Sequence, residues 1–403
     1  MLRCDYKNNN CISMALNIKK ILLLLIIFCY FLIYGCEGNN VLLNTNNTNI
    51  VNLTNRFEEY IDISNKFSTL NSGDNYLKKF NINEYVLPVP EGGEIGDQTV
   101  YGNKIYYVVT YSRKMSNFAI KVEIYSYDIN NHNTNLIYEY ENPSQDIYIN
   151  ELRANEKYLF WTILTPDNSW DLYKLTLEDK STKVIRTSKN THSKIPPVIT
   201  LTNNYLCWYE TINKNENIYF ALKIYLINEN VIKTISDNVY LTSPYTRAFI
   251  RNNIVTYLTQ NNEGININVY NIKSDQNKIL LIPTNKKIQN VISNERFTVW
   301  HENYTKTNIY VYDHKLDKLF LVNSKENSHN IFAIDLLENY VFINASDINN
   351  IFCLDINNKE KINLTSTLNN NNGYIFTRVT AENKFIAQNS NHKDKKCLII
   401  KIK

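Results

Sequence analysis

Short apolar segments recur along most of the chain at intervals of about 40 to 50 residues. They begin at Ile105, Tyr158, Tyr205, Ile254, Phe297, Tyr340 and Phe385, and each has Asn or Glu within the three residues before it. β-Branched and aromatic residues dominate these segments, and their apolar positions lack the spacing of an amphipathic helix. The pattern therefore predicts short β-strands.

A second apolar segment follows each of these except the last, and it closes on Asp, Asn or Thr. The closing residue recurs at positions 128, 176, 228, 271, 313 and 355, in steps of 42 to 52 residues. This period, with short strands separated by turn residues, is typical of β-propeller blades. We expect an all-β fold, a β-propeller of about seven four-stranded blades within a range of six to eight.

One unit, residues 289–324, shows the four strands of a blade most clearly. Its third and fourth strands are joined by a turn from Asp313 to Asp317, and similar turns begin at Asp128 and Asp355. A calcium loop of the EF-hand type also needs a Gly and a final Glu, which are missing here. We therefore interpret these acidic residues as caps of hairpin turns.

The last unit shows only three strands, near residues 374–380, 385–388 and 397–403. We expect residues 84–89, just before the first unit, to supply the missing outermost strand. Pro88 and Pro90 fit such a place because an edge strand tolerates the loss of backbone donors. The propeller would then occupy residues 81–403 and be closed by its own N-terminal strand.

The repeats have a recognisable form: a second strand ending in Trp, a polar loop, and a strand such as Asn-Ile-Tyr-Val-Tyr-Asp. This arrangement, clearest in residues 155–176 and 294–313, resembles the repeats of TolB-like and tricorn-type β-propellers of extracytoplasmic proteins. The resemblance covers residues 84–403 at the level of the repeat, so it implies fold more than function. The family's Ser-Pro-Asp-Gly turn is replaced by Thr165-Pro166-Asp167-Asn168, and the N-terminal domain of TolB itself is missing.

The first 35 residues have the order of a secretory signal: Lys19 and Lys20, an apolar run over residues 21–34, then Gly35 before Cys36. The run is shorter than the roughly 20 apolar residues of a bilayer-spanning helix. Residues 33–36 resemble the lipobox of prokaryotic lipoproteins, which implies a lipid on Cys36.

Three alternatives stay open for this segment. Tyr34 is bulkier than the usual lipobox residue, which leaves simple secretion and a retained N-terminal anchor beside lipidation. Met14 is an alternative start that gives a signal of ordinary length. We expect a protein of the cell envelope, extracytoplasmic and membrane-anchored, or alternatively secreted.

Charge and composition refine this picture. The chain has 403 residues with 43 Lys and Arg against 39 Asp and Glu, and removal of residues 1–35 leaves 39 against 38. So balanced a body argues against a nucleic-acid-binding protein. Residues 36–80 are polar and rich in Asn, with too little apolar surface to offset the entropy of ordering, so we expect a tether there.

Catalytic and metal-binding motifs are missing from the sequence. It contains no Gly-x-Ser-x-Gly elbow, P-loop or dinucleotide-binding glycine pattern, and its six His residues lack the spacing of a zinc helix. We therefore expect no metal and no cofactor. Cys207, Cys353 and Cys397 occupy apolar strand positions, which predicts buried free thiols.

The loops between second and third strands, and those between blades, should emerge together around the central channel as the binding face. Trp161, Trp208 and Trp300 share one register of the second strand, which predicts core packing between blades. The candidate ligand-binding residues on the loop face are Arg113, Asp167, Trp170, Glu210, His301, Glu302 and Tyr304, with Asp347 and His392 nearby.

Two functions of different class follow from this organisation. The first is a surface-exposed, lipid-anchored module that binds or scaffolds an envelope protein or a glycan on its loop face. The alternative is a propeller enzyme, a lyase or glycan hydrolase, in which Glu210, Glu302 or Asp347 converge from different blades without a linear motif. The absence of a catalytic motif favours the binding module.

Overall fold

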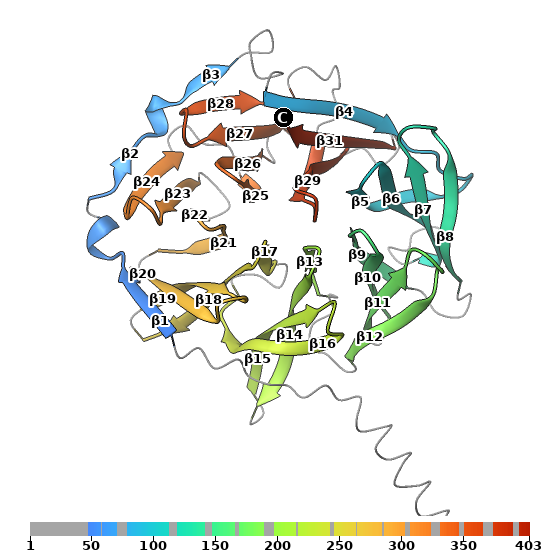
Figure 1. Ribbon diagram of the computed structural model, residues 1–403, viewed down its shortest axis with the longest axis horizontal. Helices are drawn as coiled ribbons and strands as arrows, with labels where there is room; N and C mark the ends of the chain where they lie inside the picture. Colours follow the sequence, from blue (N-terminus) through green and yellow to red (C-terminus); the bar gives the residue numbers. More distant parts are fainter. Residues whose placement is uncertain are drawn as a thin grey trace, which may run out of the picture.

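The computed structural model describes residues 47–57, 59–70, 79–112, 119–141, 147–165, 169–188, 197–214, 217–241, 246–262, 264–283, 286–302, 307–323, 331–345, 350–365, 374–389 and 395–403. Seven β-sheets stand in a ring around a central channel (Figure 1), so the predicted β-propeller with seven blades is confirmed. No helix in this described part is long and apolar enough to cross a membrane.

The strands of blades 1 to 3 follow one another outward from the channel. Blade 1 contains β5 (Glu94–Tyr101), β6 (Lys104–Ser112), β7 (Ala119–Asp128) and β8 (Thr134–Glu141). Blade 2 contains β9 (Tyr148–Ala154), β10 (Tyr158–Leu164), β11 (Trp170–Thr176) and β12 (Thr182–Ser188). Blade 3 contains β13 (Thr200–Leu201), β14 (Tyr205–Lys214), β15 (Asn217–Leu226) and β16 (Val231–Val239).

Blades 4 to 6 repeat the same antiparallel order. Blade 4 contains β17 (Phe249–Arg251), β18 (Ile254–Asn261), β19 (Gly264–Asn271) and β20 (Gln276–Ile282). Blade 5 contains β21 (Ile288–Ser293), β22 (Phe297–Glu302), β23 (Asn308–Asp313) and β24 (Lys318–Asn323). Blade 6 contains β25 (Ile331–Leu337), β26 (Tyr340–Ala345), β27 (Asn350–Asp355) and β28 (Glu360–Asn363).

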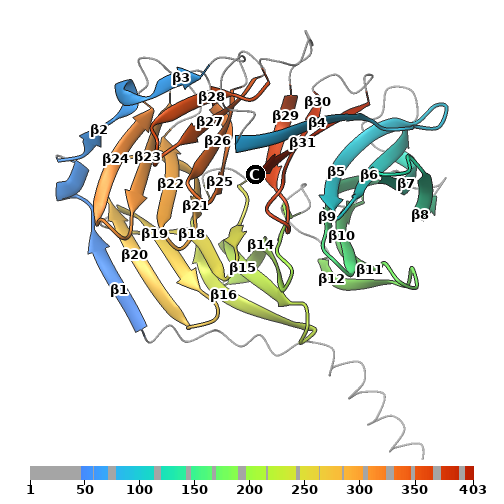
Figure 2. The same ribbon diagram turned by 45° about the horizontal axis from the view of Figure 1, so that its top comes forward.

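Blade 7 joins the two ends of the propeller chain. Its inner strands are β29 (Tyr374–Val379), β30 (Phe385–Asn389) and β31 (Lys396–Ile402), and its outermost strand is β4 (Phe80–Val86). β4 lies antiparallel along β31, from Phe80 opposite Ile402 to Val86 opposite Lys396 (Figure 2). The predicted closure of the ring by an N-terminal strand is confirmed, and the strand itself begins four residues earlier than expected.

Residues 47–70 differ from the free tether that their composition predicts. They form the strands β1 (Asn47–Asn52), β2 (Ile61–Asp62) and β3 (Ser68–Leu70), with the short 3₁₀ turns η1 (Asn55–Phe57) and η2 (Ser64–Lys66) between them. Each strand adds to a blade in parallel orientation: β1 to β20, β2 to β24 and β3 to β28. We call residues 47–70 the strap, because they run around the outer rim of blades 4, 5 and 6 (Figure 1).

The strap is ordered by backbone pairing and by a few buried anchors. Leu53 is fully buried against blades 4 and 5, and Ile63 is buried between blades 5 and 6. The Phe57 ring packs edge-on against Tyr310, at 5.2 Å between centroids. A polar segment can therefore be ordered where an open sheet edge accepts its backbone groups.

The hairpins between third and fourth strands share one capping scheme. Asp128, Asn271, Asp313 and Asp355 each accept hydrogen bonds from the backbone N–H groups two and three residues later. The residue four positions after the cap has positive φ, as at His132, Asp275, Asp317 and Lys359. The predicted use of Asp and Asn as turn caps is confirmed.

The core lies between blades and consists of large side chains from the middle strands. Trp161, Trp208 and Trp300 are fully buried, as the shared register predicts. Cys207, Cys353 and Cys397 are free and buried, so the predicted thiols are confirmed as well. The innermost strands of blades 1, 2, 4, 6 and 7 differ from this core because they carry charged residues.

Candidate functional site

The sequence-predicted site residues divide into two groups. Arg113, Asp167 and Tyr304 lie outside the described residues, as do Asp347, His392 and the lipidation candidate Cys36. Trp170, Glu210, His301 and Glu302 are described, and all four are buried. Trp170 begins β11, Glu210 lies in the middle of β14, and His301 and Glu302 end β22. The described candidates are therefore packed within and between the blades and are not exposed on the loop face.

Trp170 begins β11 and is only 3% exposed. Its ring belongs to an apolar cluster with Phe160, Leu172, Leu206 and Trp208, between blades 2 and 3. Trp170 thus packs as the core tryptophans do, because β11 pairs with β10 from Trp170 opposite Leu164 onward and so keeps its ring in the sheet.

Glu210, on β14, is held by Arg186 of the neighbouring blade. Arg186 donates from Nε at 3.1 Å and from Nη2 at 2.6 Å to the two carboxylate oxygens of Glu210. The indole N–H of Trp208 donates to Glu210 Oε2 at 3.3 Å. A bidentate ion pair of this kind joins blades 2 and 3.

His301 and Glu302 end β22 in blade 5. His301 is fully buried, with its Nε2 3.2 Å from Asn290 Nδ2. Glu302 Oε1 lies 3.2 Å from Lys286 Nζ, and Lys286 also lies over the Phe57 ring of the strap. These contacts belong to the inner wall of blade 5 and its strap, and they do not join Glu302 to Glu210.

A different set of charged residues meets in the central channel. It comprises the carboxylates Asp97, Glu151 and Asp335 and the guanidinium groups of Arg153, Arg247, Arg251 and Arg378. All come from the innermost strands of blades 1, 2, 4, 6 and 7 or from the residues directly before them. We call these seven residues the channel network.

Asp97 joins three blades. Arg378 of blade 7 contacts both of its carboxylate oxygens, at 2.9 and 3.0 Å, and Arg153 of blade 2 donates to Oδ2 at 3.0 Å. The backbone N–H of Leu152 donates to the same oxygen at 2.7 Å. Burial alone would raise the pKa of Asp97, but the two arginines and this N–H outweigh it and lower the pKa below its usual value.

Glu151 is the centre of the network across the channel. It pairs with Arg153 on its own strand, with Arg378 of blade 7 at 3.3 Å, and with Arg247 of blade 4 at 3.8 Å. These partners come from blades that are not neighbours in the ring. The channel is therefore crossed by ion pairs rather than filled with apolar side chains.

Backbone irregularity turns two of these carboxylates toward the channel. The pairing of β9 with β10 shifts between Phe160 and Thr162, and Glu151 lies in this bulge with φ of 58°. The pairing of β5 with β6 shifts between Ile95 and Gln98, which places Asp97 in a bulge as well. Bulges re-aim side chains, and positive φ in a buried non-glycine residue is a costly conformation that the surroundings must enforce.

A second centre of the network lies at Asp335. Arg251 of blade 4 pairs with Asp335 of blade 6 and donates from Nε to the carbonyl oxygen of Leu336 at 3.1 Å. Asp335 also accepts the backbone N–H of Val379 from blade 7 at 2.8 Å. This contact set ties blades 4, 6 and 7 together past the inner end of blade 5.

Arg247 lies at the edge of the network, two residues before β17 begins. Its contact to Glu151 is an ion pair at 3.8 Å, too long for a hydrogen bond, and its buried Nε has no hydrogen-bond partner in the described structure. Burial, and next the neighbouring charge of Arg378, lowers the pKa of Arg247 to about 10, so the group stays cationic at neutral pH.

A cavity of about 230 Å³ adjoins the network between blades 1, 2 and 7. Asp97, Glu151 and Arg378 line its charged side, and Tyr148, Ile149 and Gln388 are among the residues of its other walls. Ser112 and Gln388, which also line it, lie at or near the loop ends of β6 and β30. The cavity is therefore on the loop side of the channel, the side that the sequence predicts as the binding face.

Sequence reasoning missed the channel network. A signal for it is present, since Arg153, Arg251, Asp335 and Arg378 interrupt the apolar innermost strands a few residues before the next strand begins. A charge at that recurring position is unusual for a buried strand. What the sequence does not supply is the pairing, because the partners lie up to 281 residues apart.

Comparisons with known proteins support the fold only. No family model matches the chain, and no curated protein matches it in sequence. The chain is similar in structure to the β-propeller domain of the Trilobed protease from Pyrococcus furiosus, with a TM-score of 0.54 and 11% identity over 78% of this chain and 96% of that one. That domain is described as having an open velcro topology, whereas here β4 pairs with β31.

Two peptidases are similar in structure over about half of their own length. A prolyl endopeptidase matches with a TM-score of 0.53 and 5% identity over 77% of this chain and 50% of its own, and the acylaminoacyl peptidase of Pyrococcus horikoshii matches with a TM-score of 0.53 and 10% identity over 74% and 49%. This chain thus spans about half the length of either peptidase. At such identities the likeness shows the β-propeller, and the finer resemblance to TolB-like repeats stays a prediction.

Proposed function

We propose that this protein is a binding propeller that holds part of an envelope protein or glycan at the loop side of its channel. The observation that carries the proposal is the channel network beside a cavity of about 230 Å³, with arginines in excess over carboxylates. Arginine-rich, partly buried clefts with aromatic walls recognise ligands by bidentate hydrogen bonds and stacking.

The state of the carboxylates favours binding over the enzyme alternative. A glycan hydrolase needs one carboxylic acid with a raised pKa beside a second ionised carboxylate. Arg186 holds Glu210 and Lys286 pairs with Glu302, while the pKa of Asp97 is lowered. None of these three carboxylates is placed as the proton-donating acid of a hydrolase. The enzyme hypothesis, a lyase or glycan hydrolase, therefore ranks second.

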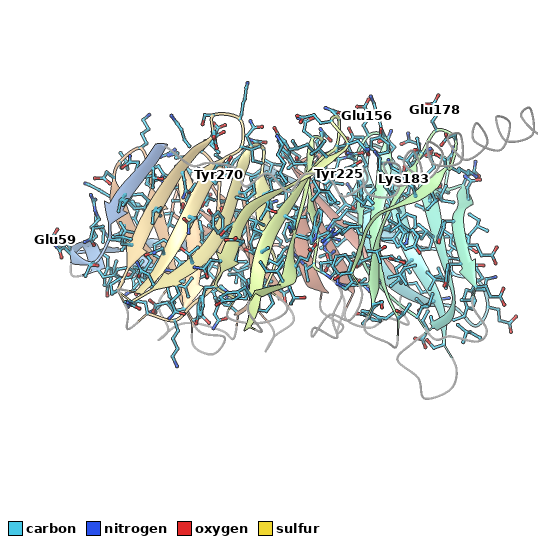
Figure 3. All side chains as sticks on the ribbon, turned by 90° about the horizontal axis from the view of Figure 1, so that it is seen from below. Glu59, Glu156, Glu178, Lys183, Tyr225 and Tyr270 are labelled. Atoms are coloured by element: carbon cyan, nitrogen blue, oxygen red, sulfur yellow. The ribbon has the colours of Figure 1, made fainter. Side chains whose placement is uncertain are left out.

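The place where the strap begins indicates how a lipid on Cys36 would orient the propeller relative to the membrane. β1 begins opposite Gln276, the first residue of β20, so the strap enters at the face of the tight turns. Glu156 and Glu178, in two such turns of blade 2, mark that face at the upper edge of Figure 3. If Cys36 carries a lipid, residues 37–46 span at most about 35 Å, which keeps the turn face near the membrane and the loop face away from it.

The test is capture of the partner from the native envelope with the full-length, membrane-inserted protein. Tyr148, a cavity residue that is 41% exposed, is replaced by Ala, and Tyr60, 39% exposed on the strap at the outer rim of blade 5, is the matched control. We expect Tyr148→Ala to reduce capture at least fivefold and Tyr60→Ala to leave it unchanged. Equal capture by both variants would refute the loop-side site.

Lipidation has its own test within this proposal. Cys36→Ala should abolish labelling by a fatty-acid analogue and release the protein from the membrane fraction. Labelling lost without release would indicate a retained N-terminal anchor, and release of the unaltered protein would indicate simple secretion.

A further inference from the structure

We propose that Arg247 binds a single carboxylate group at the end of a ligand that enters the channel from the loop side. This inference rests on the proposed binding function and deepens it, since it names the chemical group that the channel recognises.

The charges of the channel network do not cancel. Four arginines face three carboxylates, so the network carries one net positive charge. A carboxylate brings one negative charge and restores neutrality, whereas a phosphate brings more than one. Among small oxyanions, the charge balance therefore favours a carboxylate.

Hydrogen bonding identifies which arginine is available. Arg153 donates to Asp97, Arg251 to the carbonyl oxygen of Leu336, and Arg378 to Asp97 and Glu151. Arg247 has only the ion pair of 3.8 Å to Glu151, and its Nε is buried without a hydrogen-bond partner in the described structure. A buried donor without a partner is unfavourable, and a bound acceptor would remove that penalty.

Glu151 cannot supply the missing acceptor. Its Oε2 already serves Arg153 and Arg378, and its Oε1 is the atom that lies 3.8 Å from Arg247. The bulge and positive φ at Glu151 hold this carboxylate in place, so it does not move freely toward Arg247. The guanidinium fork of Arg247 keeps its geometry for an incoming planar oxyanion.

Position and size indicate a ligand end rather than a whole ligand. Arg247 precedes β17, so it lies at the loop end of the innermost strand of blade 4. The cavity that adjoins Glu151 measures about 230 Å³, below the roughly 300 to 1,000 Å³ of most small-molecule sites. It has room for the terminal residue or sugar ring of a longer chain.

The same carboxylate chemistry has two sources, the C-terminus of a peptide and a uronate sugar. The experiment uses the full-length protein and measures the thermal unfolding midpoint with four probes at matched ionic strength. The probes are an acetylated tripeptide as free acid or amide, and trigalacturonate as free acid or methyl ester. A ligand that binds only the folded state raises the midpoint.

We expect at least one free acid to raise the midpoint while its amide or ester does not, and Arg247→Gln and Arg247→Lys to weaken the response at least tenfold. The lysine variant keeps the charge and removes the fork, so its loss of response separates recognition from a simple charge effect. Arg296→Gln, at the turn face where Arg296 pairs with Asp313, is the control that keeps the response.

A response only to the peptide acid identifies a C-terminus, and a response only to the uronate identifies an acidic sugar. The proposal is overturned if neither free acid acts, if amide and ester act equally, or if Arg247→Gln responds like the unaltered protein. Envelope capture that still depends on Tyr148 after such a result would leave the binding function standing without the carboxylate. If the free acids give no response and capture does not depend on Tyr148 either, both proposals are overturned.

Discussion

Blades 1 to 3 and blades 4 to 6 are built alike, yet only the second group is covered at its outer edge. β20, β24 and β28 pair with the strap, whereas β8, β12 and β16 are the outermost described strands of their sheets. The bare edges carry charged or exposed polar residues such as Glu139, Lys183 and Asp237, which discourage pairing with other chains. The difference shows that a four-stranded blade of this propeller can form without a strap strand at its outer edge.

Two kinds of N-terminal strand contact the ring, and they differ in what they join. β4 completes blade 7 in antiparallel register over seven residues, from Phe80 to Val86. β1, β2 and β3 add parallel strands to blades that already have four. β4 is therefore expected to matter to every blade, and the strap to its own three.

The largest effect should come from removing the closing strand. Deletion of residues 81–90 takes away the partner of β31 and the apolar contacts between blades 7 and 1, where Leu87 and Tyr107 are buried. We expect the propeller to lose its cooperative unfolding transition, measured by calorimetry. An equally stable and cooperative deletion variant would contradict the closure.

A smaller effect should follow from removing one anchor of the strap. Leu53 is fully buried against blades 4 and 5, so Leu53→Ala should lower the free energy of unfolding by about 3 kcal/mol. Val184→Ala, at a residue 44% exposed on the bare edge strand β12, is the control and should change it by less than about 0.5 kcal/mol. Urea denaturation measures the free energy of unfolding of both variants. An equal decrease in the two would mean that the buried anchor in the strap stabilises the protein no more than an exposed residue on the bare edge does.

The strapped side should also respond to acid. His314 lies between blades 4 and 5. Its Nδ1 accepts a hydrogen bond from Lys278 Nζ, and its Nε2 donates one to Thr298 Oγ1, so the imidazole is neutral in the folded protein. Burial, and next the charge of Lys278, lowers the pKa of His314 to about 4. The unfolded chain takes up a proton near pH 6.5 and the folded one does not, so stability falls as the pH drops from 6.5 to 4.

This loss should amount to about 2 to 3 kcal/mol, and His314→Gln should remove it from the pH dependence of unfolding. His132→Gln, at an exposed histidine of the equivalent turn in blade 1, is the control on the bare side. An unchanged pH slope in His314→Gln would show that the interface between blades 4 and 5 does not carry the acid response.

The smallest effect is expected at the surface of the strap. Arg56 pairs with Asp317 of blade 5, and both side chains are partly exposed to solvent. Arg56→Ala should cost less than about 1 kcal/mol, because exposed ion pairs contribute little and are screened by salt. Hydrogen exchange at β24 would report a local opening. If Arg56→Ala lowered the free energy of unfolding as much as Leu53→Ala does, the attachment of the strap would depend mainly on charge.

Local rules explain why so much of the fold follows from sequence. The turn after Asp313 is capped by its own side chain, and Tyr312 reaches Asp317 within the same hairpin. Tyr127 with His132, and Tyr270 with Asp275, repeat this contact in blades 1 and 4. Such contacts depend on neighbours only a few residues apart, so they recur wherever the local sequence recurs.

The sequence by itself determined the strands, the turns, the seven-fold repeat and the N-terminal strand that closes the ring. Only the tertiary structure decided the strap and the channel network. The strap is polar, and its order comes from open edges that exist only after blades 4 to 6 have formed. No local sequence pattern predicts the channel network, because Asp97, Glu151 and Arg378 are brought together by bulges and by the closure of the ring.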